Sequence, residues 1–169
     1  ESYSKRLNIK NVNNNKNIEF DGGFTIRGRN LYGSGTINNL SKLKLSYDGK
    51  EILVAESIGF IINDEGVKSD KAKIKFYIDS DSIFHPASNL VFSENTKTLT
   101  LSRGEEGILA APFYNSYHKL DIYVETLSWK LGEPLINFSA PKGTKSIKTA
   151  QFASLNFFDL KSYDNLNTD

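Results

Sequence analysis

Short segments in which apolar and polar residues alternate follow one another across residues 41–138. In residues 73–79 (KIKFYID) the two isoleucines and the phenylalanine share one face, and residues 99–103 and 119–125 alternate in the same way. Successive side chains of a β-strand point to opposite faces of the sheet, so a period of two indicates half-buried strands. The pattern predicts an all-β architecture, and it does not by itself identify any chemistry.

Turn residues separate these segments. Asp48 and Gly49 join two alternating runs, and an Asp-Gly pair in that position favours a hairpin turn of type I′. Further strands are expected at residues 58–62, 72–78, 90–92, 98–102, 108–111, 120–126, 127–131 and 135–138. Strands spaced by roughly 8–12 residues with turns between them are typical of all-β folds. We therefore predict an antiparallel sandwich or jelly roll, or an open β-solenoid.

The two ends of the chain lack this regular pattern. Residues 1–40 are rich in Asn and Gly and are expected to be a turn-rich lead-in, with a hairpin or tight bend at residues 21–23. Residues 150–160 fit either a short C-terminal helix or a strand whose partner lies in a following domain. The polar residues 162–169 are expected to form a flexible tail. Residues 1–169 are thus predicted to be a single β-rich domain whose main sheet covers residues 41–138.

Composition excludes several classes of protein. The chain has 169 residues, 38% of them hydrophobic, which is enough for one core. Its formal charge of +1 gives no electrostatic basis for binding nucleic acid. It contains no cysteine, and it has no apolar run long enough for a transmembrane segment. Because it also lacks methionine and begins at Glu1, we expect it to be excised from a longer protein, with no signal peptide visible.

Two loops resemble ligand-binding motifs but depart from the full pattern. Asp79 and Asp81 resemble the start of a calcium loop, yet the glycine and glutamate that an EF-hand requires further along are absent. Gly33 and Gly35 resemble part of a dinucleotide fingerprint, but the third glycine and the following helix are missing. We interpret the first as a turn and the second as a site of close backbone packing or a β-bulge.

Catalytic and metal-binding templates fit no better. Ser116, His118 and Asp121 are the residue types of a catalytic triad, but triads assemble in space and not along the chain. The two histidines, His85 and His118, have no carboxylate at a ligand spacing, and His85 before a proline is expected in a turn. We expect no catalytic residue, metal ligand or cofactor. The main enzymatic alternative is a glycoside-active enzyme that uses two carboxylates among Glu105, Glu106, Asp121 and Glu125.

Residues 113–129, from Phe113 to Trp129, concentrate aromatic side chains together with amides and carboxylates. Such side chains can stack on sugars or anchor a peptide, although they are also common in strand cores. If Leu120 and Ile122 face inward, Tyr123 faces solvent. The candidate ligand-binding residues are Tyr114, Tyr117, His118, Tyr123 and Trp129.

Three segments carry a resemblance to known proteins: DSIFHP at residues 81–86, TKTLTLSR at residues 96–103, and the run at residues 111–131. They resemble stretches of very long exported or envelope-associated proteins of Bacteroidota. The first two are also loosely similar to the β-jelly-roll repeats of lipopolysaccharide-transport proteins, which stack edge to edge around a lipid-lined groove. The resemblance implies an exported protein, periplasmic or on the cell surface, and it transfers no functional residue.

Together these observations favour a non-catalytic structural or ligand-binding module of an exported cell-envelope protein. Its expected partners are neighbouring domains of the same chain and a glycan or lipid ligand, with no nucleic acid. The alternative is a carbohydrate-binding or glycan-processing domain that uses the aromatic residues 113–129. Sheet edges of a solenoid-like module would have to be paired or capped by adjacent segments.

Overall fold

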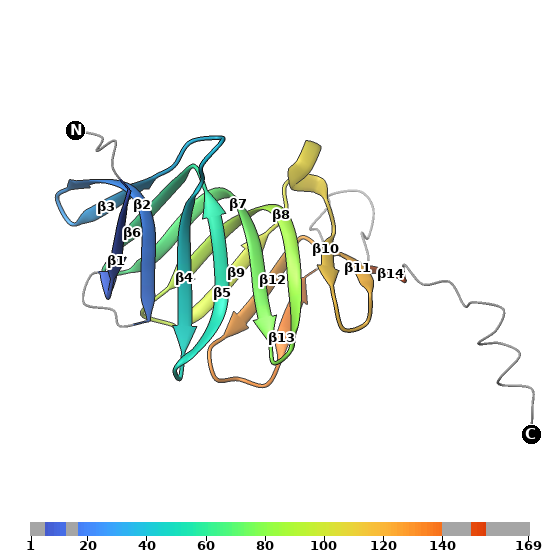
Figure 1. The fold of residues 1–169 in the computed structure, drawn as a ribbon. Coiled ribbons are helices and arrows are strands. Elements are labelled where there is room, and N and C mark those ends of the chain that lie inside the picture. The colour runs from blue at the N-terminus through green and yellow to red at the C-terminus, as the bar shows by residue number, and fades with distance from the viewer. Residues whose placement is uncertain (1–5, 13–16, 140–149, 155–169) are drawn as a thin grey trace, which may run out of the picture.

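The computed structural model describes residues 6–12, 17–139 and 150–154, which form an all-β fold with antiparallel strand pairing (Figure 1). Three long strands are β2 (Ile18–Arg27), β7 (Gly66–Ile78) and β8 (Asp81–Ser93). The shorter strands are β1 (Leu7–Lys10), β3 (Asn30–Ser34), β4 (Ser41–Tyr47), β5 (Lys50–Ser57), β6 (Gly59–Asn63), β9 (Thr98–Ser102), β10 (Phe113–Asn115), β11 (Leu120–Tyr123), β12 (Thr126–Lys130), β13 (Ile136–Ser139) and β14 (Gln151–Ser154). A short 3₁₀ helix, η2 (Gly107–Ala110), precedes β10.

The strands lie in two layers of a sandwich, and the three long strands belong to both layers. The first layer has the order β1–β2–β4–β5–β7–β8–β10–β11–β14. The second layer has the order β2–β3–β6–β7–β8–β9–β12–β13. In Figure 1 the first layer is in front and β6, β9, β12 and β13 lie behind it. The antiparallel sandwich predicted from the alternation is therefore confirmed.

Each long strand changes layer along its length. In β2, residues 18–21 pair with β4 of the first layer and residues 23–27 pair with β3 of the second layer. The change falls at Gly22, where a Cβ atom would lie 2.6 Å from the Cβ of Ser41. Glycine is required there because Ser41 Cβ and the Phe20 ring already occupy the space that a side chain would need. The prediction of a hairpin at residues 21–23 is wrong, because the turn lies at Gly28 and Arg29, where Arg27 pairs with Asn30.

The β7–β8 hairpin makes the same crossing. Residues 73–76 of β7 pair with β5, whereas residues 66–68 pair with β6. The pairing of β7 with β8 shifts register near Ala72, opposite Ser88, and Pro86 lies in the irregular part. A proline cannot donate to a ladder, so it fits where the ladder is interrupted. The turn predicted at His85 and Pro86 is therefore wrong, since both residues lie inside β8.

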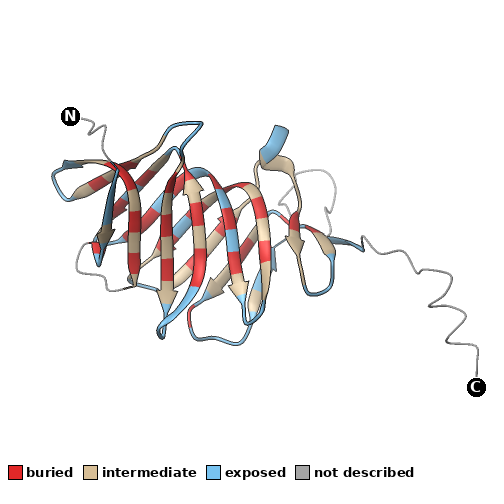
Figure 2. Cartoon of the chain, in the orientation of Figure 1, coloured by how far each residue is buried: buried red, intermediate tan, exposed pale blue. Residues whose placement is uncertain are grey.

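The core lies between the two layers, and buried residues alternate with partly exposed ones along most strands (Figure 2). Phe20 of the first layer meets Phe60 of the second layer edge to face, with ring centroids 6.1 Å apart. The rings of Phe76 of β7 and Trp129 of β12 are tilted by 55° to each other, with centroids 5.4 Å apart. These contacts join the inner faces of the two layers.

The structure confirms one further predicted local element and contradicts others. The turn at Asp48 and Gly49 is confirmed, with positive φ values of 50° and 73° as type I′ requires. The strand expected at residues 108–111 is wrong, because η2 occupies most of it. Residues 7–34 of the expected lead-in contribute β1, β2 and β3 to the sheet. Of the two alternatives for residues 150–160, the C-terminal helix is wrong over residues 151–154, which form a strand, β14. Its partner is β11 of the same domain and not a following domain. The rest of that segment and the tail at residues 162–169 lie outside the described residues.

Candidate binding surface

The outer face of the first layer carries the side chains that point away from the core. Strand register places one row across it, in the order Lys44, Val54, Lys75, Phe84, Tyr114 and Asp121. The face changes character along its length: over β2, β4, β5 and β7 it carries charged side chains on either side of the row, and over β8 and β10 it carries aromatic ones. These two halves differ in what they can bind.

The charged half is largely neutralised by its own ion pairs. Glu56 of β5 accepts from Lys42 at 3.1 Å and from Lys73 at 3.2 Å, across the two neighbouring strands. The ammonium of Lys42, with that of Lys73, lowers the pKa of Glu56 below its ordinary value. Such partly exposed pairs add little stability. They do leave this half of the face with little unpaired charge for an ionic ligand.

A groove of about 600 Å³ lies at the β1 end of the same face, where Ile37 and the residues after it approach β2 and β4. Arg6 closes one side of the groove. It donates to Asp21 at 2.8 Å, to Asn39 Oδ1 at 2.8 Å and to the Leu40 carbonyl at 2.9 Å. The Arg6 charge in the groove is therefore bound to the protein itself.

The aromatic half forms a second surface, which we call the aromatic strip: Tyr77, Phe84, Tyr114 and Tyr123. Phe84 lies opposite Tyr114, and Tyr114 lies opposite Asp121. Tyr123 follows Asp121 by two residues, so it faces the same side, and it is 37% exposed. The Lys75 ammonium lies 5.1 Å from the centroid of the Tyr77 ring, and the Arg103 guanidinium carbon lies 5.6 Å from that of Tyr123. Both cations thus sit at cation–π distance from a tyrosine.

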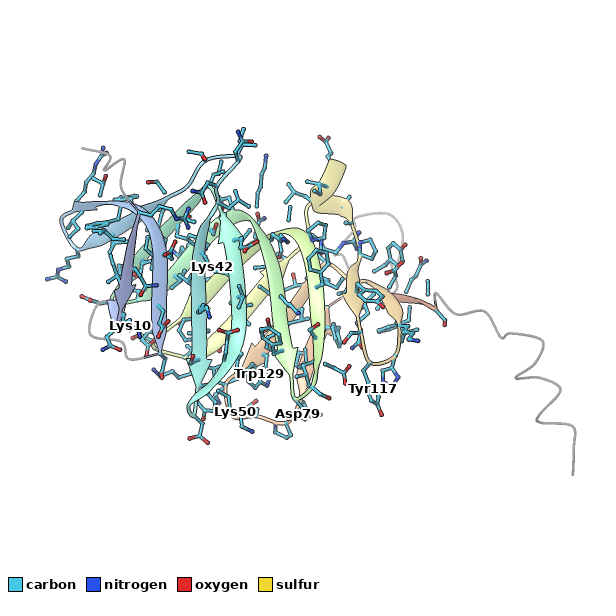
Figure 3. The ribbon with its side chains drawn as sticks, in the orientation of Figure 1. Lys10, Lys42, Lys50, Asp79, Tyr117 and Trp129 are labelled. Atoms are coloured by element: carbon cyan, nitrogen blue, oxygen red, sulfur yellow. The ribbon has the colours of Figure 1, made fainter. Side chains whose placement is uncertain are left out.

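Tyr117 and His118 lie apart from the strip, in the exposed turn between β10 and β11. Their rings meet edge to face with centroids 4.5 Å apart, and the His118 backbone N–H donates to Asn115 Oδ1 at 3.1 Å. Figure 3 shows Tyr117 at the tip of this hairpin, far from Trp129. Tyr117 and His118 therefore form a small separate patch.

Ser116 anchors the same hairpin to β8. Its hydroxyl donates to Asp81 Oδ1 at 3.0 Å and accepts from the Ser82 backbone N–H at 2.9 Å. The carboxylate that meets Ser116 is therefore Asp81, and the serine's hydroxyl is engaged in a structural contact. Asp79 occupies the turn between β7 and β8 with φ at 53°.

Trp129 lies on the inner face of β12, opposite Leu99 and Ile136. It packs on Phe76, and its indole Nε1–H donates to the Glu133 carbonyl at 2.8 Å. The five candidate residues are thus divided: Tyr114 and Tyr123 lie on the strip, Tyr117 and His118 at a hairpin tip, and Trp129 between the layers.

His85 is fully buried and belongs to a structural cluster. Its Nδ1 accepts from the Ala87 backbone N–H at 3.1 Å, so its Nε2–H donates to the Ala111 carbonyl at 2.8 Å. Arg103 also donates to the Ala111 carbonyl at 2.6 Å and to the Val124 carbonyl at 3.1 Å. Burial, with the nearby Arg103 charge, lowers the pKa of His85. Both side chains join η2 and the β10–β11 hairpin to the rest of the fold.

Sequence reasoning missed Tyr77, Phe84 and Lys75 as neighbours of Tyr114. Alternation already places Tyr77 and Lys75 on the polar face of their segment. Their position beside Tyr114 depends on the pairing of β8 with β10, which joins residues about thirty positions apart in sequence.

No protein-family model, curated protein or solved structure matches the chain. Within the described part of the chain, no helix is both long enough and apolar enough to span a membrane. In the same residues, no three His, Cys, Asp or Glu side chains gather where they could hold a metal ion. We therefore infer what the aromatic strip and the edge strands can bind from their geometry.

Proposed function

We propose that the domain is a non-catalytic structural or ligand-binding module of an exported cell-envelope protein, and that it associates with neighbouring domains of the same chain. The exported location comes from the resemblance of residues 81–86, 96–103 and 111–131 to envelope proteins. The modular role draws its support from one end of the sandwich. There the first layer finishes at β14 and the second layer at β13, so far as the described residues extend.

At this open end, aromatic side chains of the inner faces reach solvent. Phe138 lies opposite Leu127 and Phe152 lies opposite Ile122, which places both rings on the core side of their strands. They meet edge to face with centroids 6.3 Å apart, yet they are 37% and 56% exposed. An inner-face aromatic residue would normally be covered by a further strand or by another domain.

The sequences of these two strands support the same proposal. Isolated edge strands are usually protected by Lys, Pro or a bulge, because such features prevent pairing with other chains. Neither INFS of β13 nor QFAS of β14 contains a charged residue or a proline. This chemistry suits an edge that pairs with an adjacent β-segment.

Sedimentation velocity of the purified domain over a range of concentrations tests the proposal. We expect concentration-dependent association that Phe138→Lys and Phe152→Lys each reduce, since an inward charge opposes burial of the end. Ile61→Lys is the matched control, because Ile61 is 41% exposed on the outer face of β6. A wild-type domain that stays monomeric throughout, or an effect of Ile61→Lys as large as those of the two other variants, would contradict it. Hydrolysis of any polysaccharide by the pure domain would refute the non-catalytic role.

A second candidate function is carbohydrate binding through the aromatic residues 113–129. The observation that favours it is the outward position of Tyr114 and Tyr123 on the first layer, beside Asp121. Trp129 contributes less to this candidate, because it packs between the layers.

A further inference from the structure

The aromatic strip crosses four adjacent strands of the first layer: β7, β8, β10 and β11. Because neighbouring strands lie about 4.8 Å apart, the strip spans about 14 Å in the direction across the strands. Lys75 lies at one end of the Phe84–Tyr114 pair and Asp121 at the other. The Phe84 and Tyr114 rings thus lie between a hydrogen-bond donor, Lys75, and an acceptor, Asp121.

This arrangement matches the chemistry of a sugar chain. One face of a pyranose ring presents C–H groups, which pack on an aromatic ring, while its hydroxyls project from the rim. An ammonium donates hydrogen bonds and a carboxylate accepts them, so Lys75 and Asp121 can each bind rim hydroxyls. Tyrosine adds a phenolic hydroxyl at the edge of its apolar ring.

Two other classes of polymer fit less well. An extended peptide that adds to a sheet binds at an edge, where backbone groups are available, whereas the strip lies on a face and offers side chains. Nucleic acid requires several cations for its phosphates, but the strip holds Lys75 and Arg103 together with the Asp121 carboxylate. The neighbouring Lys73 is bound to Glu56. This mixed charge disfavours an anionic polysaccharide as well.

We propose that Tyr77, Phe84, Tyr114 and Tyr123 form a binding site for a neutral polysaccharide, with Lys75 and Asp121 binding its hydroxyls. This inference rests on the second candidate function and changes its residues. It adds Tyr77, Phe84 and Lys75, and it excludes Trp129.

Affinity electrophoresis through gels that contain xylan, laminarin or galactomannan, with anionic alginate as a comparison, tests the proposal. We expect at least one neutral polysaccharide to retard the wild-type domain more than alginate does. Phe84→Ala and Tyr114→Ala should each weaken this retardation about tenfold, as loss of a central aromatic anchor does. Phe84→Tyr, which keeps the ring, should restore it. Circular dichroism spectra of the variants should match that of the wild-type domain, which shows that each variant is folded.

The control variants separate the possible failures. Ile61→Ala alters an exposed apolar side chain on the opposite layer and should leave retardation unchanged. If Tyr117→Ala abolishes retardation while Phe84→Ala and Tyr114→Ala do not, glycan binding stands but the strip is the wrong site. Equal retardation by alginate would overturn the preference for neutral chains. If no polysaccharide retards the wild-type domain, both this inference and the second candidate function are wrong, while the modular role is judged separately by sedimentation.

Discussion

At the scale of single residues, the environment of a side chain decides its role more than its type does. His85 and His118 are the two histidines of the chain. His85 is buried and bound to two backbone groups, whereas His118 is exposed in a turn. Protonation of His85 would turn its acceptor Nδ1 into a donor facing the Ala87 N–H, close to the positive Arg103. The fold therefore holds His85 neutral.

The unfolding free energy should consequently fall as the solution becomes mildly acidic. The folded pKa of His85 lies below its ordinary value of 6.5, so its stabilising contribution is complete above about pH 6.5 and is lost as pH falls toward the folded pKa. Each unit of separation between the two pKa values corresponds to about 1.4 kcal/mol. Urea unfolding between pH 5 and pH 8 measures this slope.

His85→Gln should flatten the pH dependence between pH 5 and pH 7, because glutamine keeps a donor and an acceptor but does not titrate. His118→Gln makes the same replacement in the exposed β10–β11 turn, and the effect of His85→Gln is measured relative to it. The carboxylate of Glu56, whose pKa is lowered from 4.5, changes its charge below pH 5 and therefore does not affect the pH dependence measured between pH 5 and pH 7. An unchanged profile in His85→Gln would show that another group controls acid stability.

At the scale of elements, the crossing strands depend on small residues where the two layers converge. Gly33 of β3 pairs with Phe24 of β2, and a Cβ at Gly33 would lie 2.5 Å from the Phe20 ring. Phe20 is fully buried, so its ring has no space into which to move. The glycine permits the Phe20 ring to pack directly on β3. The close backbone packing expected from the sequence is found at Gly35, where a Cβ would lie 2.2 Å from the Ser41 backbone nitrogen.

Gly33→Ala should lower the unfolding free energy by about 1–3 kcal/mol, the usual cost of overfilling a packed core. Gly59→Ala is the matched control, since Gly59 also lies in a strand of the second layer, but a Cβ there would meet no atom within 4 Å. The changes in unfolding free energy of the two variants are obtained from their urea midpoints, provided that the m-value is unchanged. A Gly59→Ala loss equal to that of Gly33→Ala would show that the Phe20 contact does not set the cost, because Gly→Ala by itself reduces the entropy of the unfolded chain and favours the folded state.

At the scale of the whole molecule, three shared strands make the two layers parts of one structure. Neither layer can lose β2, β7 or β8 without disrupting the other layer. Contacts such as Phe20 with Phe60 and Phe76 with Trp129 add cross-layer packing. We therefore expect both layers to unfold together.

Unfolding in urea should thus be a single transition. Trp129 is the sole tryptophan and lies in the second layer against Phe76 of the first, so its fluorescence reports packing between layers. Far-ultraviolet circular dichroism reports all the strands. The two curves should coincide, as two-state unfolding requires. A fluorescence change that clearly precedes the loss of strand signal would mean that the layers separate before they unfold.

The sequence alone determined the all-β class, the positions of most short strands and the hairpin at Asp48 and Gly49, because alternation and turn chemistry are local properties of the chain. It did not determine that β2, β7 and β8 each serve two layers, since Gly22 and Pro86 can mark either a turn or a crossing until their partners are known. Only the tertiary structure placed Phe84 beside Tyr114 and turned Trp129 into the core. Those positions depend on pairing between distant strands, whose register is set by the packing of the complete sandwich.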